Sequence, residues 1–194
     1  MSDALGFAHA EDIDPERFSH QPFRQNMEVE HFDCGSPPLN DFLNTHEVHE
    51  YDKQNLGRTT LVYYENELVA YYTTSADSLQ TVYLQEKKRP NQYVKTGNVK
   101  VNKIPAIMIG RLAVVQKYQN RGIGRNLIGY IIGQSIELSK SMAIRIIIVE
   151  SKPESIDFYL KCGFQHIVDT RRSRRQRYRT LFLDLQAAIE AVAD

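Results

Sequence analysis

The sequence predicts an α/β fold with a mixed sheet and flanking helices. Two continuous apolar segments, AIMIGRLAVV (106–115) and AIRIIIVE (143–150), enclose a helical pattern over 122–140. This strand–helix–strand order predicts two parallel strands joined right-handedly. RTTLVYYENELVAYYTTSA (58–76) predicts an antiparallel hairpin, because two β-branched and aromatic runs flank a polar turn.

Length and composition predict one folded domain with short appendages. The chain has 194 residues, of which 42% are hydrophobic and 25% charged, as in an ordinary globular protein. We expect a loose arm over 1–26, a domain over 27–185 and a tail with a helical turn or two over 186–194. The 24 basic residues equal the 24 acidic ones, so bulk charge does not predict a polyanion binder.

The N-terminus is acidic and has no apolar stretch of the kind found in signal peptides. The longest apolar runs are too short to span a bilayer, so we expect no membrane contact. Cys34 and Cys162 are the only cysteines, which fits two free thiols in a reducing compartment. The sequence therefore predicts a cytoplasmic protein.

The segments outside the central pattern are less regular. Residues 27–35 contain an alternating stretch that predicts a short strand, and Ser36 followed by two prolines predicts the start of a helix running to about Lys53. Residues 77–104 are polar and predict a functional loop or inserted element. A short helix over 151–162, ended by Gly163, and strands near FQHIV and YRTLFLDL complete the fold.

Glycines and arginines gather where the helix over 122–140 begins. Gly122 and Gly124 have no Cβ, so an anion can approach the unpaired N–H groups at this helix end, and Arg121 and Arg125 add positive charge. The spacing G-x-G-x-x-L is neither the dinucleotide fingerprint nor a P-loop. The turn predicts a phosphate site, with a solvated helix cap as the alternative. Gly129 and Gly133, one turn apart, predict close packing of the helix on the sheet.

Two motifs resemble those of GNAT acetyltransferases. Gln119-x-x-Gly122-x-Gly124 is similar to the family's Q/R-x-x-G-x-G/A signature, and 158–164 (FYLKCGF) matches its F-Y-x-x-x-G-F motif. The resemblance covers about residues 28–185. FDCGSPPLNDFL and IPAIMIGRLAVV further resemble a subgroup that includes toxins acetylating the amino group of aminoacyl-tRNA.

The resemblance implies acetyl-CoA as cosubstrate in a wedge between two splayed parallel strands, with a bulge for which Gly110 is the candidate. The pantetheine arm would pair with the strand and the pyrophosphate would bind the turn. The implied cofactor-binding residues are Leu112, Ala113, Val114, Gln119, Asn120, Arg121, Gly122, Ile123, Gly124 and Arg125.

Acetyl transfer to an amine needs a proton for the departing thiolate and a neutral nucleophile. Tyr159 resembles the family's tyrosine that protonates the sulfur, with a core aromatic residue as the alternative. Glu150 ends the second parallel strand, where ligands gather in such sheets, and is the candidate base, with a surface carboxylate as the alternative. A backbone N–H near Leu112 or Val114 would polarise the carbonyl.

RRSRRQRYR (171–179) holds six arginines and no acid, so the rest of the chain carries a formal charge of −6. Contact with RNA is one reading of this run, and a solvated loop or pairing with acidic groups in a homodimer is the other. The arginines proposed to contact RNA are Arg171, Arg172, Arg174, Arg175 and Arg177.

Three functions remain in competition. The leading one is an acetyl-CoA-dependent N-acetyltransferase acting by direct attack in a ternary complex on a small amine, a protein amine or an aminoacyl-tRNA. The second is a non-catalytic acyl-CoA-binding module, and the third is an RNA-binding protein that uses the arginines alone.

His46 and His49 lie three residues apart without a convincing third ligand, so we expect no metal.

Overall fold

The computed structural model describes residues 14–27, 29, 31–81, 99–167 and 178–193. Seven strands form one sheet in the order β1-β2-β3-β4-β5-β7-β6. Within it only β4 and β5 pair in parallel, and the other neighbours are antiparallel. The mixed sheet predicted from the sequence is confirmed.

The antiparallel part of the sheet is built from the N-terminal half. It contains β1 (Phe18–Pro22), β2 (Arg58–Tyr64) and the long β3 (Glu67–Gln80). The hairpin turn between β2 and β3 consists of Glu65 and Asn66, both with positive φ, as tight hairpins with right-handed strand twist require. The long β4 (Lys103–Val114) pairs with β3 along its whole length.

The second half supplies the parallel crossover and the far edge of the sheet. Helix α3 (Ile123–Ser139) connects β4 to β5 (Ile146–Ser151), as the sequence predicts. A 3-10 turn (Pro153–Ser155) leads into α4 (Ile156–Lys161). The remaining elements are β6 (Gln165–His166), β7 (Arg179–Asp184) and α5 (Gln186–Ala193).

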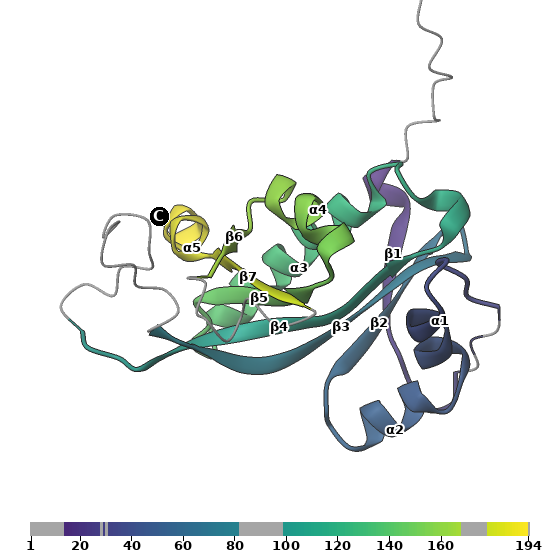
Figure 1. The fold of residues 1–194 in the computed structure, drawn as a ribbon, viewed down its shortest axis with the longest axis horizontal. Helices are drawn as coiled ribbons and strands as arrows, with labels where there is room; N and C mark the ends of the chain where they lie inside the picture. Colours follow the sequence, from purple (N-terminus) through teal and green to yellow (C-terminus); the bar gives the residue numbers. More distant parts are fainter. Residues whose placement is uncertain (1–13, 28, 30, 82–98, 168–177, 194) are drawn as a thin grey trace, which may run out of the picture.

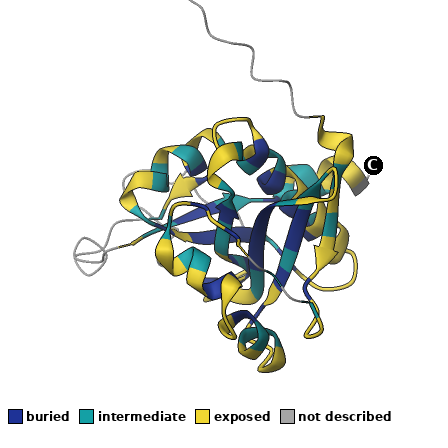
Figure 2. Ribbon diagram, turned by 90° about the vertical axis from the view of Figure 1, so that its right-hand side faces the viewer, coloured by how far each residue is buried: buried dark blue, intermediate teal, exposed yellow. Residues whose placement is uncertain are grey.

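Helices cover both faces of the sheet. Figure 1 shows α3, α4 and α5 on one side and α1 (Pro37–Asn44) and α2 (Glu47–Lys53) on the other. The core on the α3 side contains Ile109, Leu127 and Ile147, and a second cluster of Phe42, Leu61 and other apolar side chains packs under α1 and α2. Figure 2 shows this arrangement as buried strands between helices whose outer faces are exposed. Helices α3, α4 and α5 therefore bury one face of the sheet, and α1 and α2 bury part of the other, where Ile146, Ile148 and Phe182 belong to a separate apolar cluster.

Three local predictions are wrong. The segment 36–53 is two helices, because the chain breaks at Thr45, whose hydroxyl accepts a hydrogen bond from the Glu47 N–H at 3.2 Å. The described residues of 27–35 form no strand. Within the segment predicted as a loose arm, Phe18–Pro22 form β1 on the edge of the sheet.

Short 3-10 turns flank the regular elements, at Pro15–Arg17 and Gln116–Tyr118. The predicted loop 77–104 is shorter than expected, because β3 continues to Gln80 and β4 starts at Lys103. Its centre, 82–98, lies outside the described residues, as do 168–177 with five arginines of the cluster. No helix within the described parts is long and apolar enough to cross a membrane.

Candidate acetyl-transfer site

A bulge at Gly110 shapes the site. Thr73 pairs with Arg111 and the next residue, Thr74, pairs with Ile109, so Gly110 is the extra residue of β4. Up to this point Ile107 and Ile109 pack on the α3 side. One extra residue reverses the alternation of side chains along a strand.

Beyond the bulge, the two faces of β4 are therefore exchanged. Leu112 and Val114 pack on the α3 side, whereas Ala113 lies in the cluster under α1 and α2. Without the extra residue, Arg111 would point into the α3-side core. The bulge instead places its guanidinium over the ring of Phe42 in α1.

The two parallel strands separate at the same point. Pairing runs from Ala106 with Ile146 to Ile109 with Val149 and stops there. Both strands continue, but residues 111–114 of β4 pair only with β3. The side of β4 that faces β5 is therefore open over this stretch, which is the splayed pair that the family resemblance implied.

A cavity of about 500 Å³ lies at this opening. Eight of the ten predicted cofactor-binding residues line it, and the exceptions are Ala113 and Arg121. The Ala113 side chain is buried on the opposite face of the sheet, and the Arg121 guanidinium lies 5.7 Å from the centre of the Tyr118 ring at the surface. The backbone of Ala113 remains part of the open strand.

The glycine turn has the geometry of an anion site. Gly122 precedes α3 with a φ of 83°, in the left-handed region that favours glycine, and offers no side-chain cap to the first turn of the helix. The first-turn N–H groups therefore remain available to an anion at the positive end of the helix dipole. Arg125 and Lys161 line the same cavity and add positive charge.

Two residues of the motif have structural partners that the sequence did not reveal. The Gln119 amide donates hydrogen bonds to the carbonyl oxygens of Cys34 and Val114, both at 2.9 Å, so it ties the turn to the N-terminal segment and to β4. A Cβ on Gly124 would lie 3.1 Å from the Phe158 ring. Gly124 thus allows α4 to pack against α3 as well as leaving room at the turn.

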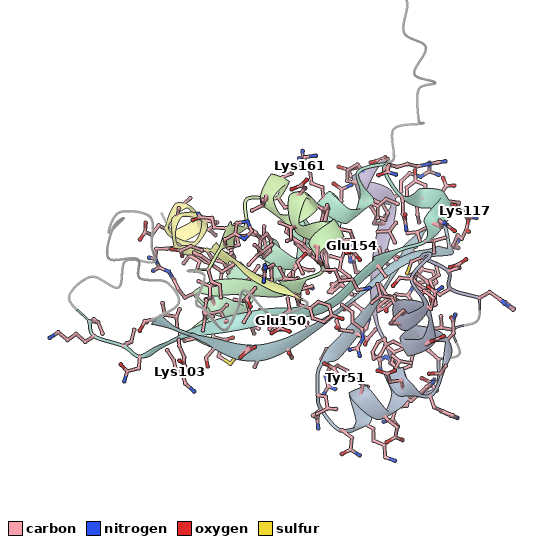
Figure 3. All side chains as sticks on the ribbon, in the orientation of Figure 1. Tyr51, Lys103, Lys117, Glu150, Glu154 and Lys161 are labelled. Carbon is pink, nitrogen blue, oxygen red and sulfur yellow. The ribbon has the colours of Figure 1, made fainter. Side chains whose placement is uncertain are left out.

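A second cavity, of about 950 Å³, adjoins the first. Tyr159, Leu112 and Gln119 line both cavities. Figure 3 labels Glu150, Glu154 and Tyr51, which line the second cavity from β5, the turn before α4, and α2. A cosubstrate in the first cavity would therefore present its reactive end to an acceptor in the second.

Tyr159 and Glu150, the predicted acid and base, both line the second cavity. Tyr159 is 7% exposed and packs against Phe158 and Phe164. Burial raises the pKa of its phenol well above the ordinary value, so the group stays protonated at neutral pH. Glu150 is exposed at the end of β5 and lines the second cavity.

Several lining residues of the second cavity were not predicted. Arg111 donates a hydrogen bond from Nη2 to Glu47 Oε1 at 2.9 Å, and Tyr51 lies beside this pair. No local sequence pattern predicts this contact, since Glu47 and Tyr51 lie 60 residues or more from Arg111 in the chain. The bulge in β4 and the packing of α1 and α2 against the sheet bring them together.

Comparisons with known proteins agree with this geometry. A family model described as an acetyltransferase (GNAT) domain matches residues 56–166. The chain belongs to the GNAT acetyltransferase family. This GNAT protein is therefore an acetyl-CoA-dependent N-acetyltransferase, as the sequence predicted.

One curated relative of this GNAT protein is a tRNA-acetylating toxin of Mycobacterium tuberculosis (strain ATCC 25618 / H37Rv). It is 26% identical over 139 residues, which are 71% of this chain and 78% of the relative. Two solved structures share the fold. AtaT complexed with acetyl-methionyl-tRNAfMet has a TM-score of 0.72 at 21% identity, covering 91% of this chain and 99% of AtaT. A mutant of KacT has a TM-score of 0.73 at 24% identity, covering 91% of this chain and 99% of KacT.

Metal ligands do not gather in the described residues, which contain no group of three or more His, Cys, Asp or Glu side chains suited to a metal ion. The rings of His46 and His49 lie 5.6 Å apart. The five predicted RNA-contacting arginines from Arg171 to Arg177 lie outside the described residues. Tyr178, the next residue, lines the second cavity.

Proposed function

We propose that this GNAT protein acetylates the α-amino group of an aminoacyl-tRNA in a ternary complex. The observation that carries this proposal is the pair of adjoining cavities that share Tyr159 at the gap between β4 and β5. This arrangement supports direct transfer, because both reactants can lie against one wall. The tRNA-acetylating relative supports the acceptor class.

In the proposed reaction the amine nitrogen forms a bond with the thioester carbonyl carbon, and the carbon–sulfur bond breaks. Glu150, directly or through water, takes the proton that the ammonium loses. Tyr159 donates its phenolic proton to the departing thiolate, and its raised pKa keeps the phenol protonated until negative charge develops on the sulfur. An N–H of β4 near Leu112 polarises the carbonyl, since that stretch has no partner strand on the side of β5.

The nucleic-acid part of the acceptor has a proposed contact region. Tyr178 lines the second cavity, and the arginine-rich segment 171–177 directly precedes it in the chain. Arginines there would contact phosphates, which carry no amino-acid information but add affinity.

The homodimer and the cytoplasmic location expected from the sequence stay predictions.

The experiment that tests this function uses acetyl-labelled acetyl-CoA and a set of tRNAs, each charged with one amino acid. The expected product is labelled RNA that loses its label as an N-acetyl amino acid when the ester is hydrolysed. Label on proteins or small amines alone would contradict the tRNA acceptor. Bound acetyl-CoA without transfer to any acceptor would support the non-catalytic module instead.

A further inference from the structure

Arg111 occupies a position in the second cavity that the transfer chemistry above does not use. The bulge at Gly110 turns it toward α1 and α2, where its guanidinium carbon lies 3.6 Å from the centre of the Phe42 ring and 4.8 Å from that of Tyr51. Stacking on an aromatic face fixes the plane of a guanidinium and leaves its N–H groups pointing outward along the edge. The Arg111 side chain is 22% exposed, so this group is held within the cavity wall.

One described residue accepts a hydrogen bond from this guanidinium. Glu47 Oε1 receives the bond from Nη2 at 2.9 Å. A guanidinium has five N–H donors, so the bond to Glu47 balances the charge of Arg111 but uses only part of its hydrogen-bonding capacity. Because Arg111 lines the second cavity, its remaining N–H donors can bind an acceptor there.

The described lining of this cavity is acidic. Its four carboxylates are those of Asp41, Glu47, Glu150 and Glu154, and its two cations are Arg111 and Lys152, so the formal charge is −2. Such a cavity favours an acceptor with a cationic amine and opposes one that also carries a carboxylate. A free amino acid carries that carboxylate. In an aminoacyl ester this carboxylate is replaced by an uncharged ester group, whose carbonyl oxygen accepts a hydrogen bond.

We propose that Arg111, neutralised by Glu47, donates a hydrogen bond to the ester carbonyl oxygen of the acceptor, and that this ion pair excludes the carboxylate of a free amino acid. The inference rests on the proposed function and extends it to how the acceptor is chosen. Without Glu47, Arg111 would be an unpaired cation, which binds a carboxylate well.

The decisive variant is Glu47→Gln, which removes one negative charge and retains the side-chain shape. The probes are one amino acid in three forms: free, as its methyl ester, and esterified to its tRNA, with kcat/KM measured for each. We expect the wild-type protein to prefer the methyl ester to the free amino acid by about tenfold or more. Glu47→Gln should reduce this preference by about fivefold or more, mainly through faster acetylation of the free amino acid.

The matched control is Glu50→Gln. Glu50 lies on the same helix, pairs with Lys53 at 3.7 Å and is exposed outside the cavity lining. This control should leave the preference unchanged. An unchanged preference in Glu47→Gln, or a wild-type protein that accepts the free amino acid as well as the ester, would overturn the inference.

Arg111→Gln supplies a second measurement. We expect kcat/KM for the ester to fall by about tenfold or more while the affinity for acetyl-CoA and the melting temperature stay close to the wild-type values. A loss of folding in this variant would leave Glu47→Gln as the deciding measurement. Acetylation of the methyl ester but of no aminoacyl-tRNA would refute the tRNA acceptor, and the ratio of ester to free amino acid would still test the ion pair.

Discussion

A single phenol lies between the two cavities, and its environment decides what it can do. Tyr159 packs among aromatic rings, and its raised pKa reflects burial. The sequence offered a core aromatic and a cofactor-facing tyrosine as alternatives. The two are compatible, because the residue belongs to the α3-side core and also lines both cavities.

We predict that Tyr159→Phe lowers kcat by about a hundredfold or more, because the thiolate would leave without a proton donor. The dissociation constant for acetyl-CoA should change by less than about threefold, since the variant keeps the ring and its packing. Single-turnover kinetics and a binding titration separate the two effects. Tyr130→Phe is the matched control, because Tyr130 lies on α3 outside the lining of both cavities. An unchanged single-turnover rate in Tyr159→Phe would remove the acid role.

His20 on β1 is a second residue whose burial has a measurable consequence. Its ring stacks on Tyr130 at 3.5 Å between centres, and its Nδ1 is buried with no hydrogen-bond partner among the described residues. Burial lowers the pKa of His20 below 6.5. As the pH falls, the unfolded chain therefore binds a proton at His20 at a higher pH than the folded chain does.

We predict that the protein loses stability as the pH falls below about 6.5, because protonation of His20 then favours the unfolded state. His20→Phe keeps a stacked ring without a titrating group, so its free energy of unfolding should fall less between about pH 7 and pH 5. Urea unfolding of both proteins at these two pH values measures the difference. An equal loss in both proteins would show that His20 does not contribute.

At the scale of elements, the glycines of α3 have unequal roles. The predicted packing role of Gly129 and Gly133 is wrong, since both are exposed and a Cβ on either would meet no atom of the described residues within 4 Å. Gly122 also has open space, but its φ of 83° strains any other residue. The positive φ therefore favours glycine at position 122, whereas neither the backbone conformation nor the available space requires glycine at 129 and 133.

We predict that Gly129→Ala and Gly133→Ala each raise the free energy of unfolding by about 0.5–1 kcal/mol, because alanine favours a helix interior. Gly122→Ala should lower it by about 1 kcal/mol, because alanine avoids the left-handed conformation. Denaturant unfolding measures all three variants. Destabilisation by the two helix-interior variants would mean that this exposed face has a partner that requires glycine.

At the scale of the whole molecule, charge is separated along the chain. The segment 171–179 carries six arginines, while the second cavity has an acidic described lining. The acceptor proposed above has a cationic amine and phosphates, which are opposite in charge to the cavity lining and to the arginines, respectively. Bulk neutrality therefore conceals two regions of opposite sign.

We predict that replacing Arg171, Arg172, Arg174, Arg175 and Arg177 with glutamine raises KM for aminoacyl-tRNA at least about tenfold and flattens its dependence on salt. Acetylation of the amino-acid methyl ester should not change, because that substrate has no phosphate. The control is Lys53→Gln with Lys140→Gln, two exposed lysines in local ion pairs. An unchanged salt dependence would place the RNA contact elsewhere.

The sequence by itself determined the order of elements around α3, the glycine turn and the aromatic motif of α4. These features are local, since hydrophobic period, helix-start residues and motif spacing act within about 20 residues. In this way the sequence pointed to Tyr159 and to eight residues that line the first cavity, and their roles in binding and catalysis stay predictions. The strand β1 was missed because pairing with β2 decides it, and the break at Thr45 was missed although the Thr45 hydroxyl accepts a local hydrogen bond from the Glu47 N–H.

Only the tertiary structure decided the acceptor side of the site. Arg111 and Glu47 are 64 positions apart, and their contact depends on one extra residue in β4 and on how α1 and α2 pack against the sheet. The direction in which Arg111 points follows from the pairing of Thr73 and Thr74, which lie on another strand. Local patterns carry no information on such long-range register, so most of the lining of the first cavity was readable from the sequence and the ion pair in the second cavity was not.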